Sequence, residues 1–306
     1  MHTKSKIFIH LFLFSILVVA CQRVPVESRV VPSQSEWVER GGSIVRGLAA
    51  CGFCHGEADR RPDAVLIGGQ KLSDRYGEVI APNLTPHRHG LKDWKDEDII
   101  RVLRGGLAPN NREVSDEMHE GYQWMSDSDL FAVASYLRSL PPLPGKSERR
   151  EIGFIARNTV GFLDVNRENL GGVPEIPRRF NIARGKYLVD HVARCSSCHN
   201  SPGSEYSGVG YLSGGRVFKY GSKEQRIAPS LEVSSVTGLR SWDKAALVRF
   251  LRSGETVDGR YIDNKFCPVA FYKNAEEQDL LDIASFLLKG STELDENAES
   301  SDNYKE

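Results

Sequence analysis

Cys51-Gly52-Phe53-Cys54-His55 and Cys195-Ser196-Ser197-Cys198-His199 both follow the pattern Cys-x-x-Cys-His, and the sequence around them repeats as well. In Arg40-Gly41 and Arg184-Gly185, the glycine lies ten residues before the first cysteine of the motif. The matching downstream segments are Ala81-Pro82-Asn83-Leu84 with Ala228-Pro229-Ser230-Leu231, Gly90-Leu91-x-x-Trp94 with Gly238-Leu239-x-x-Trp242, Leu103-Arg104-Gly105-Gly106 with Leu251-Arg252-Ser253-Gly254, and helical patterns at 129–137 and 279–287. The chain therefore contains two copies of one module.

The Cys-x-x-Cys-His motif is the attachment sequence of haem c. Its two thiols form thioethers with the haem vinyl groups, and the histidine that follows is placed to coordinate the iron. One match alone would also fit a redox-active dithiol or half of a zinc site. Two matches in matching surroundings favour haem. The sequence thus predicts two haem c groups, bound by Cys51, Cys54 and His55 and by Cys195, Cys198 and His199.

Each half resembles a class I cytochrome c domain, and the pair is similar to the cytochrome c subunits and diheme cytochromes that serve gluconate, alcohol and aldehyde dehydrogenases. The resemblance covers residues 36–143 and 179–290. It implies an all-α fold of two tandem class I cytochrome c domains, each wrapped around a covalently bound haem.

The resemblance also implies which of the repeated positions lie close together within each half. The first and last helices of each domain are expected to cross, with Gly41 and Gly185 admitting Tyr136 and Phe286. The prolines of the two Ala-Pro segments, Pro82 and Pro229, are expected on the proximal side of each haem, near His55 and His199.

Met118 stands ahead of the last helix of the first half, where a class I domain usually presents a methionine to the distal face of its haem. A thioether there would favour ferrous iron and raise the potential. We expect Met118 to be the distal ligand of the first haem, although His119 follows it in place of the usual proline. The alternatives that the sequence leaves open are His119, Met125, His87 and His89.

The second half contains no methionine, so its own domain offers no thioether to the second haem. Cys267-Pro268 stands at the corresponding place and resembles the Met-Pro of the family. A thiolate is a strong anionic donor, so ligation by Cys267 would lower the potential of the second haem below that of the first. The open alternatives are a buried apolar thiol, a disulfide between chains, ligation by Lys265, Lys273 or His191, and an open iron.

The N-terminus resembles the signal of a bacterial lipoprotein. Lys4 and Lys6 precede an apolar run over residues 7–20, which is shorter than the roughly 18 residues that a membrane-spanning helix needs. We expect residues 1–20 to be removed and Cys21 to be lipidated, which would anchor a periplasmic protein to a membrane. The alternative is an ordinary signal peptide with an incidental cysteine.

Composition sets the remaining limits. The 306 residues include 40 Lys+Arg and 41 Asp+Glu, which excludes a wholly disordered chain and a polytopic membrane protein and argues against a general nucleic-acid binder. The expected segments are a signal peptide (1–20), a tether (21–35), cytochrome c domain 1 (36–143), a linker (144–178), cytochrome c domain 2 (179–290) and a disordered acidic tail (291–306).

The sequence therefore predicts an electron carrier: a diheme cytochrome c lipoprotein that passes single electrons between a periplasmic or membrane donor and an acceptor. Its partners would be redox proteins, either a dehydrogenase or a terminal oxidase or reductase. No catalytic residue is expected. The alternative is a haem enzyme, a peroxidase or an oxidoreductase of sulfur compounds, that acts at the second haem.

Overall fold

The computed structural model describes residues 32–114, 117–146, 148, 150–159, 172–179, 181–204, 206–220 and 224–289. The predicted signal peptide, Cys21, the acidic tail and part of the linker lie outside these residues. The described residues from Gln34 to Lys289 form one compact unit. Within the described ranges, no helix combines the length and the apolar character needed to cross a membrane.

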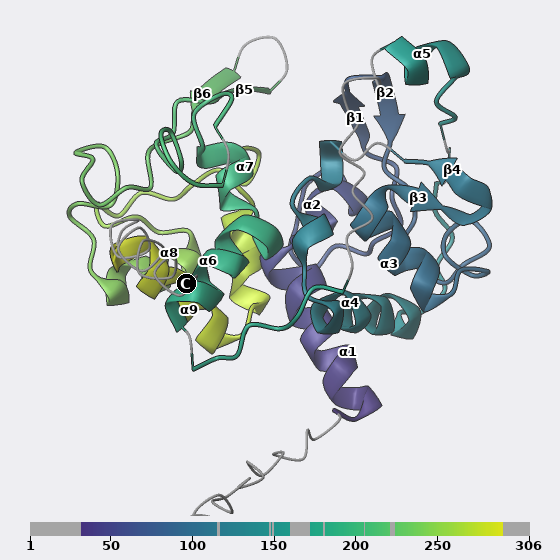
Figure 1. The fold of residues 1–306 in the computed structure, drawn as a ribbon, viewed down its shortest axis with the longest axis horizontal. Helices are drawn as coiled ribbons and strands as arrows, with labels where there is room; N and C mark the ends of the chain where they lie inside the picture. The colour runs from purple at the N-terminus through teal and green to yellow at the C-terminus, as the bar shows by residue number, and fades with distance from the viewer. Residues whose placement is uncertain are drawn as a thin grey trace, which may run out of the picture. The chain divides into compact units, whose positions relative to one another are not determined.

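Helices and short turns of helix make up most of the regular secondary structure of the first half (Figure 1). Its elements are α1 (Gln34–Ser43), the π-helical turn η1 (Ile44–Leu48), α2 (Gly52–His55), β1 (Lys71–Asp74), β2 (Gly77–Ile80), α3 (Asp96–Gly105), β3 (Leu107–Ala108), η2 (Pro109–Asn111), β4 (Arg112–Glu113), η3 (Glu117–His119), η4 (Tyr122–Trp124) and α4 (Asp127–Ser139). Helix α5 (Phe154–Thr159) belongs to the connection between the halves.

The second half repeats this order. Its elements are α6 (Asn181–Tyr187), η6 (Leu188–Val192), α7 (Cys195–His199), β5 (Val217–Tyr220), β6 (Glu224–Ile227), α8 (Lys244–Ser253), η7 (Pro268–Asn274) and α9 (Glu277–Lys289). An isolated bridge between Glu255 and Tyr261 stands where the first half has β3 and β4. The sequence repeat is thus also a repeat of secondary structure.

The prediction of an all-α fold is only partly met. Helices fit a cytochrome c fold, but the described residues also form three small antiparallel sheets, β1–β2, β3–β4 and β5–β6. Their strands are two to four residues long, which is too short to leave a clear alternating pattern in the sequence. The division into two domains also stays a prediction, because one continuous core contains residues of both halves, among them Leu130 and Leu280.

Glycine lets the first and last helices of each half approach closely, with α1 against α4 and α6 against α9 (Figure 1). A Cβ atom on Gly41 would lie 1.9 Å from the carbonyl oxygen of Ala132 and 2.7 Å from Cβ of Tyr136. A Cβ atom on Gly185 would lie 2.7 Å from Cβ of Phe286. The expected crossing at both glycines is confirmed.

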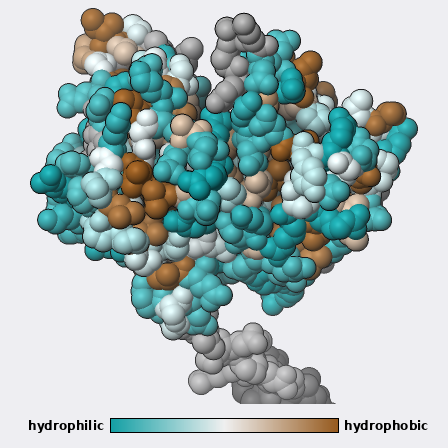
Figure 2. Space-filling view, turned by 180° about the vertical axis from the view of Figure 1, so that it is seen from behind, coloured by the Kyte–Doolittle hydropathy of each residue, from teal (hydrophilic) through white to brown (hydrophobic). Residues whose placement is uncertain are grey.

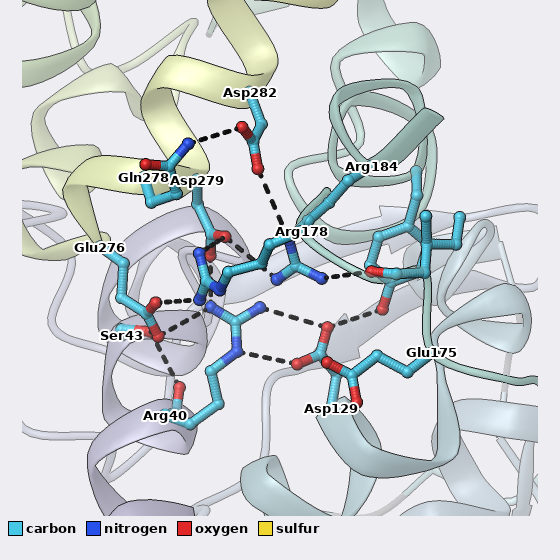
Figure 3. Close-up of polar contacts among 12 residues, drawn as sticks. Arg40, Ser43, Asp129, Glu175, Arg178, Arg184, Glu276, Gln278, Asp279 and Asp282 are labelled. Atoms are coloured by element: carbon cyan, nitrogen blue, oxygen red, sulfur yellow. Dashed lines mark hydrogen bonds and ion pairs between the residues drawn. The ribbon is translucent and has the colours of Figure 1, made fainter. Parts of the chain in front are cut away.

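The arginine before each of these glycines enters a buried network of ion pairs (Figure 3). Arg40 donates from Nε to Asp129 of α4 at 2.8 Å and from Nη1 to Asp279 of α9. Arg184 donates from Nη2 to Asp279 at 3.1 Å. The repeated Arg-Gly and Asp-Leu pairs of the sequence are therefore partners in space, and Arg40 reaches the aspartates of both halves.

Tyr187 adds a second link between the halves, because its hydroxyl donates to Oδ2 of Asp129 at 2.7 Å. Burial by itself would raise the pKa of Asp129, but Arg40 beside it and the hydrogen bonds from Arg40 and Tyr187 hold this pKa below its ordinary value. A carboxyl whose pKa falls on folding stabilises the folded state above its unfolded pKa, and that contribution is lost as the pH falls through the folded pKa. Asp129 therefore stabilises the protein at neutral pH.

Replacing Arg40 by methionine is expected to lower the free energy of unfolding by about 3 to 5 kcal/mol, because it leaves the buried carboxylate of Asp129 without its ion-pair partner. The matched control is Arg61→Met. The Arg61 side chain is 54% exposed and pairs with Glu57 and Asp59 in solvent, so its loss should cost far less stability than the loss of Arg40. Denaturant unfolding at neutral pH measures both values. Equal losses in the two variants would show that the buried network does not hold the fold together.

The surface is mixed in character. Figure 2 shows, on the face it draws, small hydrophobic clusters separated by hydrophilic residues. Among the described residues, the apolar side chains most exposed to solvent are Phe154, Ile155, Val209 and Val236. Phe154 and Ile155 lie side by side at the start of α5.

Candidate functional site

Both Cys-x-x-Cys-His motifs follow the same backbone path. A π-helical turn precedes each, and the residue just before each first cysteine is left-handed, with φ of +45° at Ala50 and +55° at Arg194. This conformation is unfavourable for residues other than glycine. Its presence at both places indicates that tertiary contacts set the turn that leads into α2 and α7.

Each motif histidine is oriented by a proline carbonyl. Nδ1 of His55 lies 2.9 Å from the carbonyl oxygen of Pro82, and Nδ1 of His199 lies 2.8 Å from that of Pro229. These are the two prolines that the family resemblance placed beside the histidines. Because Nδ1 is engaged, Nε2 is the nitrogen left to bind a metal. Burial lowers the pKa of both imidazoles, so both are neutral, which is the form that binds metals.

The four motif cysteines are free thiols, as is Cys267. Burial raises the pKa of Cys51 to about 12, with the neighbouring Cys54 adding to the effect. In the ranges that the structure describes, no group of three or more His, Cys, Asp or Glu could hold a metal ion. The thiols therefore lie unpaired beside a neutral imidazole in each half.

Arg194 connects the two motifs. It immediately precedes the second motif, but its guanidinium lies 4.7 Å from the ring centroid of Tyr122 and donates to the carbonyl oxygen of Met118 at 2.8 Å. Its positive charge is also close enough to Cys51 and Cys54 to act on the pKa of both thiols, in the lowering direction. A residue of the second half thus forms part of the surroundings of the first motif.

These residues fit a haem group. Nε of Arg194 is buried and has no hydrogen-bond partner among the described residues, and buried N–H groups of this kind normally have one. A haem propionate is an anionic acceptor that would suit it. Free thiols on a short helix, followed by an imidazole with Nε2 available, complete the donor set for thioether attachment and iron ligation.

On the other side of the first site, the structure brings His119 rather than Met118 opposite His55. The ring centroids of His55 and His119 are 6.3 Å apart, and their planes differ by 13°. Met118 lies in the same short turn, η3, and is partly buried. Burial, with help from His55 and Arg194, lowers the pKa of His119 to about 3.

The remaining candidates of the first half lie elsewhere. Met125 is 1% exposed and belongs to the apolar core. The rings of His87 and His89 contact each other edge to face, with their centroids 4.9 Å apart. His87 is half-buried, and His89 is exposed. No contact links these residues to His55 in the part of the chain that the structure describes.

Cys267 lies at the start of η7, close to both cysteines of the second motif. Burial, with Cys198 nearby, raises the pKa of Cys267 to about 12. The side chain is therefore a neutral thiol in the protein alone, and only a strong positive charge such as that of ferric iron would make it a thiolate. Of its competitors, the Lys265 ammonium forms ion pairs with Glu224 and Asp263.

The two sites adjoin. Phe271, which lies in η7 of the second half, packs against Phe53 of the first motif with ring centroids 6.3 Å apart, and it would be 3.0 Å from a Cβ atom on Gly52. Tyr122 and Tyr272, at equivalent places in the two halves, are close enough to interact electrostatically. The first motif therefore packs against the turn that precedes the last helix of the second half, and Arg194, just before the second motif, packs against Tyr122 in the corresponding turn of the first half.

Comparison with known proteins also finds c-type cytochromes. The chain is 27% identical to the cytochrome c subunit of a quinone alcohol dehydrogenase from Gluconobacter oxydans, over 82% of this chain and 54% of that subunit. It is 25% identical to the cytochrome subunit of fructose dehydrogenase from Gluconobacter japonicus, over 71% of this chain and 46% of that protein. It is 24% identical to a diheme c-type cytochrome from Cereibacter sphaeroides, over 71% of this chain and 73% of that protein.

The homologues of this chain are thus cytochrome c subunits of dehydrogenases and a diheme cytochrome c, which confirms the resemblance drawn from the sequence. The chain spans about half the length of the first two. No protein-family model matches the chain.

The sequence analysis missed Arg194 and placed His119 behind Met118. Arg194 gave a weak signal, since it stands directly before the second motif where the first half has Ala50. His119 was considered only as an alternative to Met118, because the family pattern directs attention to the methionine.

Proposed function

We propose that this chain is a diheme cytochrome c that carries single electrons between a donor and an acceptor. The observation that supports it most is that each half fixes its motif histidine by the same hydrogen bond to an equivalent proline, beside two free thiols. The cytochrome c homologues support electron transfer as the activity.

In this proposal Cys51, Cys54 and His55 hold the first haem, and Cys195, Cys198 and His199 hold the second. Bound haem would supply reversible one-electron chemistry. The chain orients each motif imidazole through a proline carbonyl and packs Phe53 of the first motif against Phe271 of the second half. Cys267 is proposed as the distal ligand of the second haem, and Met118 and His119 compete for that position at the first.

The partners and the location are also proposals. Two of the homologues are cytochrome subunits of an alcohol and a fructose dehydrogenase, so a membrane-bound dehydrogenase is the donor we propose. We further propose that a lipid on Cys21 holds the protein at the periplasmic side of a membrane. The homologues give no support to the alternative of a haem enzyme at the second site.

A potentiometric titration followed by visible absorption tests this function. We expect two reversible one-electron steps, with the second haem at the lower potential, and no turnover of added peroxide. Cys267→Ser should raise the lower potential by on the order of 100 mV, because the variant loses an anionic donor that stabilises ferric iron. Peroxide turnover would contradict the carrier function. Unchanged potentials in Cys267→Ser would contradict only the ligation by Cys267.

A further inference from the structure

The rings of His119 and His55 have a separation and an orientation that would allow both to bind one metal ion. Their planes are nearly parallel, at 13°, with centroids 6.3 Å apart. A first-row metal ion binds an imidazole nitrogen at about 2.0–2.1 Å, so two rings that bind one ion from opposite sides have centroids roughly 6 to 6.5 Å apart. The observed separation lies within that range.

The His119 imidazole also lacks another role. Neither of its ring nitrogens has a hydrogen-bond partner among the residues that the structure describes, although the side chain is partly buried. Its aromatic neighbours are the rings of His55 and Tyr122, the latter with a centroid 6.1 Å away. The ring nitrogens of His119 are therefore available to a ligand on the side of His55.

Met118 cannot share this orientation. Both residues lie in the 3₁₀ turn η3 (Glu117–His119), where successive side chains point about 120° apart. The turn that presents His119 to His55 therefore directs Met118 elsewhere. The backbone carbonyl of Met118 is also held by Arg194 at 2.8 Å, which fixes this turn.

A comparison of the halves removes the positional argument for Met118. Tyr122 and Tyr272 each stand seven residues before the aspartate of the last helix, Asp129 and Asp279. With these tyrosines as the common reference, Met118 corresponds to Pro268 and not to Cys267. Met118 is therefore displaced by one residue, and His119 by two, from the position that carries the proposed ligand of the second half, so neither residue stands at the position of Cys267.

We propose that His119, and not Met118, is the distal ligand of the first haem, which then has two histidine ligands. This inference rests on the proposed function, because it requires a haem on the first motif. A second imidazole in place of a thioether lowers the potential of the first haem. It stays above that of a thiolate-bound second haem, because neutral imidazole is the weaker donor.

The test uses the haem-loaded full-length protein, with His119→Ala and Met118→Leu as a matched pair. Leucine keeps the size and apolar character of methionine. Electron paramagnetic resonance and near-infrared magnetic circular dichroism of the oxidised proteins report the spin state and the axial ligands of each haem. The pyridine haemochrome spectrum counts the covalent haems in every variant.

We expect Met118→Leu to match the wild type. His119→Ala should convert one of the two haems from low spin to high spin, and imidazole added to the solution should restore low spin. High-spin iron in Met118→Leu, or no change in either variant, would overturn the inference. If His119→Ala fails to fold, the far-red absorption of a methionine–iron bond in the oxidised wild type would overturn it as well. A wild type without covalent haem would instead refute the proposed function.

Discussion

Replacing Cys51 and Cys54 together by serine is expected to leave the chain with one covalent haem and to destabilise the first half strongly. Serine cannot form the thioethers, and a half of about 110 residues buries little apolar surface without a porphyrin. The neighbours of the first motif come from both halves: Phe53 contacts Phe271, and Arg194 lies beside Tyr122. The double substitution should therefore also destabilise the second half.

The reciprocal variant is the control for this experiment. Cys195→Ser with Cys198→Ser should also retain one haem, now the first. Intact mass gives the number of haems, and near-ultraviolet circular dichroism reports whether the aromatic residues are still packed. Two haems remaining in either double variant would show that the Cys-x-x-Cys-His motifs are not the attachment sites.

Gly185→Ala is expected to lower the free energy of unfolding by about 3 kcal/mol or more. The new Cβ atom would lie 2.1 Å from the carbonyl oxygen of Asp282 and 2.7 Å from Cβ of Phe286. A backbone carbonyl inside a helix cannot rotate away, so α6 would have to move off α9. That movement would also disturb Arg184, which lies next to Gly185 and pairs with Asp279.

Gly105→Ala is the matched control for this substitution. Gly105 is the last residue of α3, and a Cβ atom on it would meet no atom within 4 Å. Alanine is the better helix former, so this variant should be unchanged or stabilised by up to about 1 kcal/mol. Denaturant unfolding of the haem-loaded proteins gives both values. A similar loss of stability in both variants would contradict the close approach of α6 and α9.

The sequence alone was sufficient where function depends on short, repeated motifs. The two Cys-x-x-Cys-His motifs, the Ala-Pro segments and the glycines at the helix crossings were identified from the repeat, and the structure places Pro82 and Pro229 on the motif histidines. The Arg-Gly and Asp-Leu repeats were noticed without a role. That Arg40 pairs with the aspartates of both halves is a long-range contact with no local signal.

The sequence was insufficient where one residue decides the direction of a side chain. In a 3₁₀ turn, a shift of one position changes the direction by about a third of a turn, so spacing alone cannot choose between Met118 and His119. The three hairpins were missed for a related reason, since strands of two to four residues carry too little pattern. Lipidation at Cys21 and the acidic tail lie outside the described residues and stay predictions.

The central claim is that one polypeptide carries two covalent haems and exchanges electrons through both. The most direct measurement is the intact mass of the mature protein, taken together with its pyridine haemochrome absorbance. We predict the mass of the mature, lipid-modified polypeptide plus two haem groups and an absorbance equal to two haems c per chain. A mass equal to the polypeptide alone, with no haemochrome absorbance, would contradict this account.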